Sequence, residues 1–318
     1  MNTTNYRKRL PTIVCWLLLA AFFFIGILVV VMIVIVSAGA NSADFEHLTK
    51  NQTAIMSVLQ NIIAFIIPAV VVAKLMKPSC GESISHQLRL DKAPALKWVL
   101  VVLAVYFVAL PAMNWITVWN ENVHLPSYMQ RLEELFRASE DQAQEATKQL
   151  LESTSLLEML AMFFVVAVLT GVGEEIFFRS SLLGTALDRN PRHAHLFVWT
   201  VAFIFSAFHL QFYGFVPRLL LGAWFGYLML WSRSVWVPII AHAFNNGMVV
   251  VFTYLVNNNI LSENSLDVIG TTNNEAFPWL AIASAVLTIV LIAAASRMKV
   301  RTLPPPPPRP LNPVITND

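Results

Sequence analysis

Residues 156–187 read LLEMLAMFFVVAVLTGVGEEIFFRSSLLGTAL and are mostly apolar. This stretch is long enough to cross a bilayer as a helix, which takes about 20 mostly apolar residues. It nevertheless carries two adjacent carboxylates, Glu174 and Glu175, and the arginine Arg179. A charge at the centre of a membrane helix costs about 2.5 to 3.5 kcal/mol on insertion scales, so such residues persist mainly where they are paired or used. The stretch therefore predicts a membrane helix that holds a polar centre.

The composition of the whole chain also indicates a membrane protein. Of the 318 residues, 57% are hydrophobic and 13% are charged, whereas a soluble domain carries about 25% charged residues. We expect an all-α fold, a polytopic membrane helical bundle with about eight transmembrane helices. The expected spans are 11–37, 54–73, 98–116, 156–187, 196–211, 217–231, 235–256 and 278–296, of which the fifth and sixth are short.

Lysine and arginine residues give the expected orientation, because they stay in the cytoplasmic loops. They gather before the first span, after the last and in alternate loops, so both termini should be cytoplasmic. We expect an integral, multi-pass protein of the plasma or inner membrane, in contact with the lipid bilayer. The net charge of +2 gives no reason to expect a nucleic-acid partner. The residues on the expected cytoplasmic side are Arg7, Lys8, Arg9, Lys74, Lys77, Arg89, Lys92, Lys97, Arg189, Arg192, Arg233, Arg297, Lys299 and Arg301.

The long loop after the third span contains apolar residues at helical spacing. Met129, Leu132, Leu135 and Phe136 recur among Arg, Glu and Gln residues, which is typical of an amphipathic helix on a membrane surface. Such a helix is either a lid over a site or a solvated connector that rests on lipid headgroups.

Three motifs at helical spacing place polar residues inside the later spans. Glu175 and Arg179 are four residues apart and can neutralise one another on one helix face. Glu174 is turned by about 100° from Glu175 in an α-helix, so it can face a different neighbour. His242 and Asn246 are also four residues apart, and together they can donate to one oxygen. The three motifs are Glu174-Glu175-x-x-x-Arg179, Phe205-x-x-x-His209 and His242-x-x-x-Asn246.

The depths of these motifs in the membrane allow them to meet. Glu174 and His209 each lie 13 residues from the expected cytoplasmic ends of their spans, which is about 20 Å at 1.5 Å per residue. By the same rise, His242 and Asn246 lie roughly 10 and 16 Å deep. Four polar groups on three spans therefore fall in one region of the membrane.

The order EExxxR, FxxxH, HxxxN on successive spans resembles the CPBP (Abi) family, intramembrane endopeptidases related to the type II CAAX prenyl protease. The resemblance covers about residues 156–256. Many members have glycine just after the motif arginine, where this chain has Ser180, and we expect a small packing difference there with no loss of chemistry. The expected organisation is 1–155 with three spans and the amphipathic outer loop, 156–256 as the CPBP/Abi catalytic core, 257–300 with an outer loop and the last span, and 301–318 as a Pro-rich, disordered cytoplasmic tail.

The resemblance implies a glutamate-dependent hydrolase that cleaves a peptide bond of a membrane-embedded or lipid-anchored protein or peptide, of which a CAAX-like substrate is one kind. Carried over by position, Glu174 and His209 hold and activate a water, while His242 and Asn246 stabilise the oxyanion. Paired donors in a dry cavity stabilise a developing oxyanion by several kcal/mol. The expected supporting residues are Glu175 and Arg179 as an ion pair and Phe205 as packing around the pocket.

Several alternatives remain open at this stage. No cofactor is expected, although Glu174, His209 and His242 could make a three-ligand zinc site. The spacing lacks the compact HExxH arrangement, and Asn246 suits an oxyanion donor better than a zinc ligand. The protein could also be a non-catalytic scaffold or immunity protein on the same fold, or a proton-coupled transporter with Glu174 and His209 as a relay.

Overall fold

The computed structural model describes residues 10–38, 48–76, 83–262 and 279–298, and every regular element in them is a helix. Seven helices or continuous helical runs are long and apolar enough to cross a membrane. The predicted all-α polytopic bundle is therefore confirmed. The predicted Pro-rich tail, the basic residues before the first span and residues 263–278 of the last outer loop lie outside the described residues.

Apolar sequence forms helices here because a bilayer offers no water to the backbone, so each N–H and C=O group must be satisfied within the segment. The spanning elements are α1 (Thr12–Ala38), the run α2, η2 and α3 (Lys50–Leu59, Gln60–Ile66, Ile67–Leu75), α5 (Leu96–Glu121), the run α7, η4, α8, η5 and α9 (Leu156–Met162, Phe163–Leu169, Thr170–Glu174, Glu175–Leu183, Gly184–Arg189), α11 (Phe215–Ser232), α12 (Trp236–Asn257) and α13 (Trp279–Arg297). The others are α4 (Ile84–Gln87), η3 (Ser127–Met129), α6 (Gln130–Leu151), η6 (Pro191–His193) and α10 (Ala194–Ala207).

The expected fifth span is shorter than predicted. Helix α10 has 14 residues, which is about 21 Å, against a hydrocarbon thickness of about 30 Å. The chain leaves the helix after Ala207 and turns through residues 208–214, where Leu210 adopts a left-handed φ of 55°. The prediction of a helix through Gln211 is wrong because this turn interrupts an apolar run that hydropathy alone reads as continuous.

Three stretches of the spanning helices are π-helical, with each backbone hydrogen bond closing over five residues instead of four. They are η2, η4 and η5. Pro68, the second residue of the helix that follows η2, has no N–H to donate and crowds the carbonyl four residues earlier. This explains the wider turns before it. Such segments are frequent at functional sites because they change which residues share a face.

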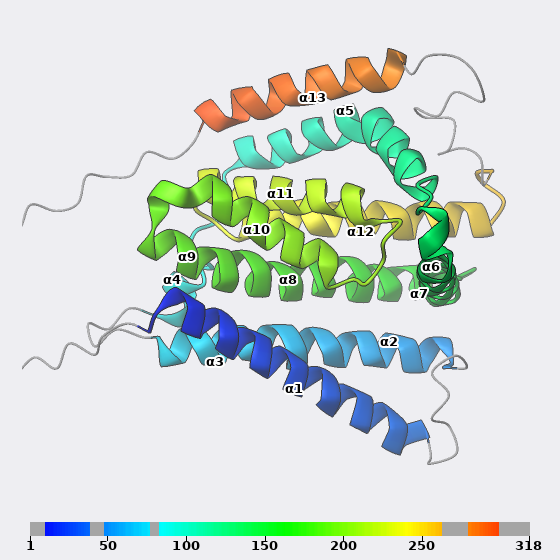
Figure 1. The fold of residues 1–318 in the computed structure, drawn as a ribbon, viewed down its shortest axis with the longest axis horizontal. Helices are drawn as coiled ribbons and strands as arrows, with labels where there is room; N and C mark the ends of the chain where they lie inside the picture. Colours follow the sequence, from blue (N-terminus) through cyan, green and yellow to red (C-terminus); the bar gives the residue numbers. More distant parts are fainter. Residues whose placement is uncertain (1–9, 39–47, 77–82, 263–278, 299–318) are drawn as a thin grey trace, which may run out of the picture.

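The run from α7 to α9 occupies the middle of the bundle (Figure 1). Helix α1 and the α2–α3 run pack on one side of it, and α10, α11 and α12 pack on the other. Helices α5 and α13 lie against one another beyond α11 and α12. The polar stretch that opened the sequence analysis is therefore surrounded by protein.

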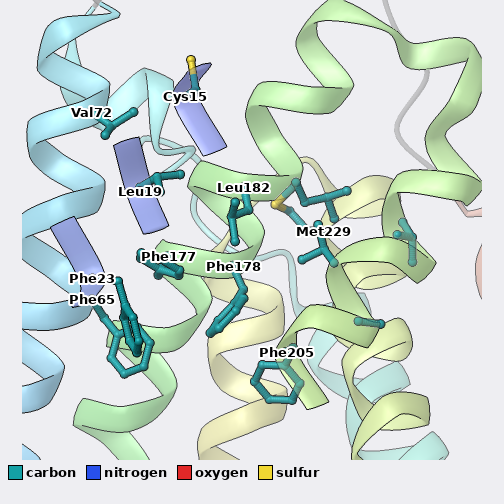
Figure 2. Packing of buried hydrophobic residues seen from close by; sticks show 14 of the residues in the cluster. Cys15, Leu19, Phe23, Phe65, Val72, Phe177, Phe178, Leu182, Phe205 and Met229 are labelled. Carbon is teal, nitrogen blue, oxygen red and sulfur yellow. The ribbon is translucent and has the colours of Figure 1, made fainter. Parts of the chain in front are cut away.

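A row of phenylalanine rings crosses this interior from α1 to α10 (Figure 2). The ring centroids of Phe23 and Phe65 are 5.2 Å apart, those of Phe65 and Phe177 5.4 Å, and those of Phe178 and Phe205 5.2 Å. Lipid tails are as apolar as these rings, so close packing and dispersion hold the helices together rather than exclusion of water. The row ends at Phe205, four residues before His209.

The predicted amphipathic helix is α6, and it lies across one end of the bundle (Figure 1). Its residues contact the turn after α10: the ring of Phe136 stacks on Phe212 at 5.1 Å, and Arg137 lies 4.2 Å from the ring centroid of Tyr213. Arg137 also donates to Glu133 at 2.7 Å, and this bond is the main reason that the pKa of the Glu133 carboxyl falls to about 2. Helix α6 is thus attached to the turn that carries His209.

Candidate active site

The predicted ion pair of the first motif is present and fully buried. Arg179 donates from Nη1 to Oε1 of Glu175 at 2.8 Å, and neither side chain is exposed to solvent. Arg179 also donates from Nη2 to the carbonyl of Gly222 at 2.9 Å, and its guanidinium lies 4.4 Å from the ring centroid of Phe205. These contacts tie η5 to α10 and α11.

The same carboxylate oxygen orients His242 on α12. Nδ1 of His242 lies 2.8 Å from Oε1 of Glu175, and because a carboxylate accepts, Nδ1 is the donor. The imidazole stacks on Phe225, with centroids 5.1 Å apart and an interplanar angle of 20°. The ring is therefore held both along its edge and across its face, and its Nε2 points away from Glu175.

Glu174 faces His242 as well. The prediction that it faces a different neighbour from Glu175 is therefore wrong. Oε2 of Glu174 lies 3.9 Å from Nε2 of His242, so the two carboxylates flank opposite nitrogens of one ring. The physical reason is that an imidazole has nitrogens on two edges, so carboxylates that leave the helix in different directions can both reach the ring of His242, Glu175 at Nδ1 and Glu174 at Nε2. Glu174 is buried, and among the described residues its Oε2 has no hydrogen-bond partner.

His209 lies just beyond the end of α10, and not inside a helix as predicted. Its Nδ1 lies 2.8 Å from the carbonyl oxygen of Phe205, which can only accept, so Nε2 is left as an acceptor. The rings of His209 and His242 both pack against Phe205, at centroid distances of 5.1 and 6.0 Å. The second and third motifs therefore meet at one aromatic side chain.

Asn246 lies one turn along α12 from His242 and is fixed by two hydrogen bonds. Its Nδ2 donates to the carbonyl of Val166 in η4 at 3.1 Å, and its Oδ1 accepts from Asn245 at 3.2 Å. The other hydrogen on Nδ2 of Asn246 has no acceptor among the described residues. Asn245, the neighbouring residue, thus helps to hold the side chain of Asn246 in place.

Comparison with known proteins assigns this part of the chain. Residues 156–248 match the family model described as Rce1-like, the type II CAAX prenyl endopeptidases. The chain carries an Rce1-like domain. This supports membership of the CPBP/CAAX protease family, whose members act on membrane-associated proteins. No curated protein and no solved structure matches the chain.

The Rce1-like domain receives one buried polar residue from outside its own bounds, which the sequence analysis missed. Asn61 in η2 is buried and donates from Nδ2 to the hydroxyl of Thr170 at 3.2 Å, while its Oδ1 has no partner among the described residues. An amide in an apolar span is costly unless satisfied, and that cost is the signal that could have singled it out. Its Oδ1 lies against Gly173, next to Glu174.

Gly173 of the Rce1-like domain should not tolerate a side chain. A Cβ there would lie 2.6 Å from Oδ1 of Asn61, so we expect Gly173→Ala to lower the free energy of unfolding by about 1 to 3 kcal/mol, the usual cost of overpacking. The measurement is denaturant unfolding of purified protein in micelles. The double variant Gly173→Ala, Asn61→Ala should recover part of the loss. Equal stability of Gly173→Ala and wild type would contradict the packing described here.

Ser180, where many family members have glycine, makes a bond that glycine cannot. Its hydroxyl donates to the carbonyl of Leu88 at 2.5 Å and so ties the Rce1-like domain to the segment that carries α4. The expected packing difference is thus an added contact.

A metal ion fits the described side chains poorly. Among them, no group of three or more His, Cys, Asp or Glu residues is arranged to hold one. His242 donates from Nδ1 to Glu175 and keeps Nε2 free, as a metal-ligating histidine does, but its described neighbours do not complete a set of three ligands. Metal analysis of active protein would measure whether zinc is bound.

Proposed function

We propose that this protein is an intramembrane endopeptidase that hydrolyses a peptide bond of a membrane-associated substrate with a water activated by Glu174 and His209. The observation that carries the proposal is the Oε2 of Glu174, a buried carboxylate oxygen without a hydrogen-bond partner among the described residues, facing Nε2 of His242 at 3.9 Å. A buried polar atom without a partner calls for an explanation, and a bound water is one. A separation of this size is one that a water molecule can bridge.

Glu174 and His209 suit the activation of water because both offer acceptors. A water that donates one hydrogen to Oε2 of Glu174 and the other to Nε2 of His209 keeps a lone pair for the carbonyl carbon. As its oxygen bonds to that carbon, Glu174 takes a proton and later delivers it to the leaving nitrogen when the C–N bond breaks. General base catalysis of this kind contributes about 10²- to 10⁴-fold in rate.

Stabilisation of the oxyanion needs hydrogen-bond donors, and the tautomer of His242 determines whether its Nε2 can donate. Its Nδ1 proton is bound to Glu175, so Nε2 donates only when the ring carries both protons. In that form the ring is a cation between the carboxylates of Glu174 and Glu175. The free hydrogen on Nδ2 of Asn246 is the second donor, and one such donor is worth about 2.7 to 4 kcal/mol. Glu175 and Arg179 support the reaction by holding His242.

The substrate in this proposal is a membrane-embedded or lipid-anchored protein or peptide, and a CAAX-like tail is its narrower form. The family match supports this class because the matched family model is described as type II CAAX prenyl endopeptidase. The orientation with both termini in the cytoplasm is proposed from the placement of lysine and arginine residues.

The proposal is tested by comparing membrane proteomes of cells that express wild-type protein, Glu174→Ala or Glu158→Gln. Glu158 is the matched control, because it lies at the other end of the same helical run, exposed and 3.4 Å from Lys50. Cleavage products should appear with wild type and Glu158→Gln and be absent with Glu174→Ala. Identical cleavage products in all three samples would contradict the protease proposal and favour a non-catalytic scaffold. Substrate flux into liposomes that depends on Glu174 would instead favour the transporter.

A further inference from the structure

Arg218 is a cation in the first turn of the apolar helix α11, and the sequence analysis did not single it out. A charge in such a position is costly and marks a functional site by default. The guanidinium folds back over Gly214, where a Cβ would lie 2.9 Å from Nη2. Nη2 donates to Oε1 of Gln211 at 2.6 Å, whereas Nη1 is buried and has no hydrogen-bond partner among the described residues.

The guanidinium is bonded to Gln211, which lies two residues after His209. Gln211 also reaches α6, because its Nε2 lies 3.4 Å from Oε1 of Glu140. The charge of Arg218 is close enough to interact with the carboxylates of Glu174 and Glu140 and with the ring of His209. Arg218 is therefore close to the reacting groups and connected to α6 through a single amide.

Glu140 is an incomplete counter-ion for this arginine. It reaches Arg218 through Gln211, and its Oε2 is also buried without a hydrogen-bond partner among the described residues. Burial raises the pKa of the Glu140 carboxyl above its usual value, so the charged form is disfavoured. Nη1 of Arg218 and Oε2 of Glu140 thus both lack a hydrogen-bond partner among the described residues. A second anion beside Arg218 would accept a hydrogen bond from Nη1.

We propose that Arg218 binds a carboxylate of the substrate and so places the peptide beside Glu174. The inference rests on the proposed function. Arginine suits this role because its planar fork matches the two oxygens of a carboxylate, and Nη1 is the donor still available. The carboxylate is either the C-terminus of the substrate or an acidic side chain near the cleaved bond, since both present the same group.

The test uses purified full-length protein in liposomes and three membrane-anchored peptides that differ only at the end. One has a free C-terminal carboxylate, one a C-terminal amide, and one an amide with an aspartate placed near the end. Wild type should cleave an acidic peptide with a KM about 10- to 100-fold lower than the neutral amide, the usual effect of a hydrogen bond to a charged group. The peptide with the lower KM identifies the source of the carboxylate.

Three variants separate recognition from structure. Arg218→Gln should raise the KM for the acidic peptide to that of the neutral one, with a much smaller change in kcat. Glu140→Gln should lower the KM for the acidic peptide, because it removes the competing anion. Arg233→Gln, at the other end of α11, is the matched control and should discriminate as wild type does.

The outcomes distinguish this inference from the proposed function. If wild type cleaves no peptide, the protease proposal fails. If wild type cleaves acidic and neutral peptides with the same KM, the protease stands and the role of Arg218 is wrong. The role is also wrong if Arg218→Gln impairs both peptides equally and lowers the thermal stability, because the arginine then only attaches α6.

Discussion

Changing Glu174 to glutamine is expected to lower kcat by about 10²- to 10⁴-fold, because glutamine keeps the shape of the side chain and cannot accept the proton of the water. The fold should survive, since Oε2 of Glu174 has no hydrogen-bond partner among the described residues to lose. The measurement is cleavage of a membrane-anchored peptide by purified protein, with the unfolding midpoint determined in the same preparation.

Glu175 provides the comparison for this experiment. Glu175→Gln removes the acceptor charge shared by Arg179 and His242, so it should lower the unfolding midpoint as well as the rate. The two adjacent carboxylates are thus expected to differ. Glu174→Gln should lower the activity alone, whereas Glu175→Gln should lower both the activity and the stability. A Glu174→Gln protein that keeps more than about a tenth of the wild-type kcat would contradict its role as the base.

The largest expected effect on stability comes from Arg179→Met. Methionine fills much of the same volume, but it leaves the carboxylate of Glu175 buried without its cation, and breaking a buried pair in this way costs about 3 to 5 kcal/mol. The carbonyl of Gly222 also loses its donor. The free energy of unfolding, measured by denaturant titration in micelles, should fall by that amount.

A double-mutant cycle tests whether the charge on Glu175 causes this loss. The variant Arg179→Met, Glu175→Gln should be more stable than Arg179→Met alone, because it leaves no uncompensated charge in the interior. If the two variants unfold at the same point, the loss comes from the packing of Arg179 against Phe205 and not from the ion pair.

The sequence predicted the spanning helices well because the membrane imposes a simple rule: apolar stretches of sufficient length form helices. The run from Leu156 extends to Arg189, close to the expected end near Leu187. The pair of Glu175 and Arg179 could also be predicted, because its spacing is local. The assignment of catalytic roles to Glu174, His209, His242 and Asn246 stays a prediction that the kinetic experiments test.

Sequence patterns did not predict the position of a site residue where that position depends on a distant segment or on a turn inside an apolar run. His209 lies in a turn that hydropathy does not mark, since Phe208 and Leu210 are as apolar as the helix before them. Asn61 reaches Gly173 from a span more than a hundred residues earlier. Arg218 was hidden by the apolar run around it, although a lone cation at that place is a signal in its own right.

The π-helical stretch Glu175–Leu183 makes the site sensitive to the length of the chain as well as to its side chains. Deleting one residue between Glu175 and Arg179 would bring the arginine one position closer to the glutamate and turn it by about 100° around the helix axis. Arg179 would then no longer lie beneath the carboxylate that aligns His242. Variants of this region should accordingly accept many replacements at lipid-facing positions while rejecting insertions and deletions altogether.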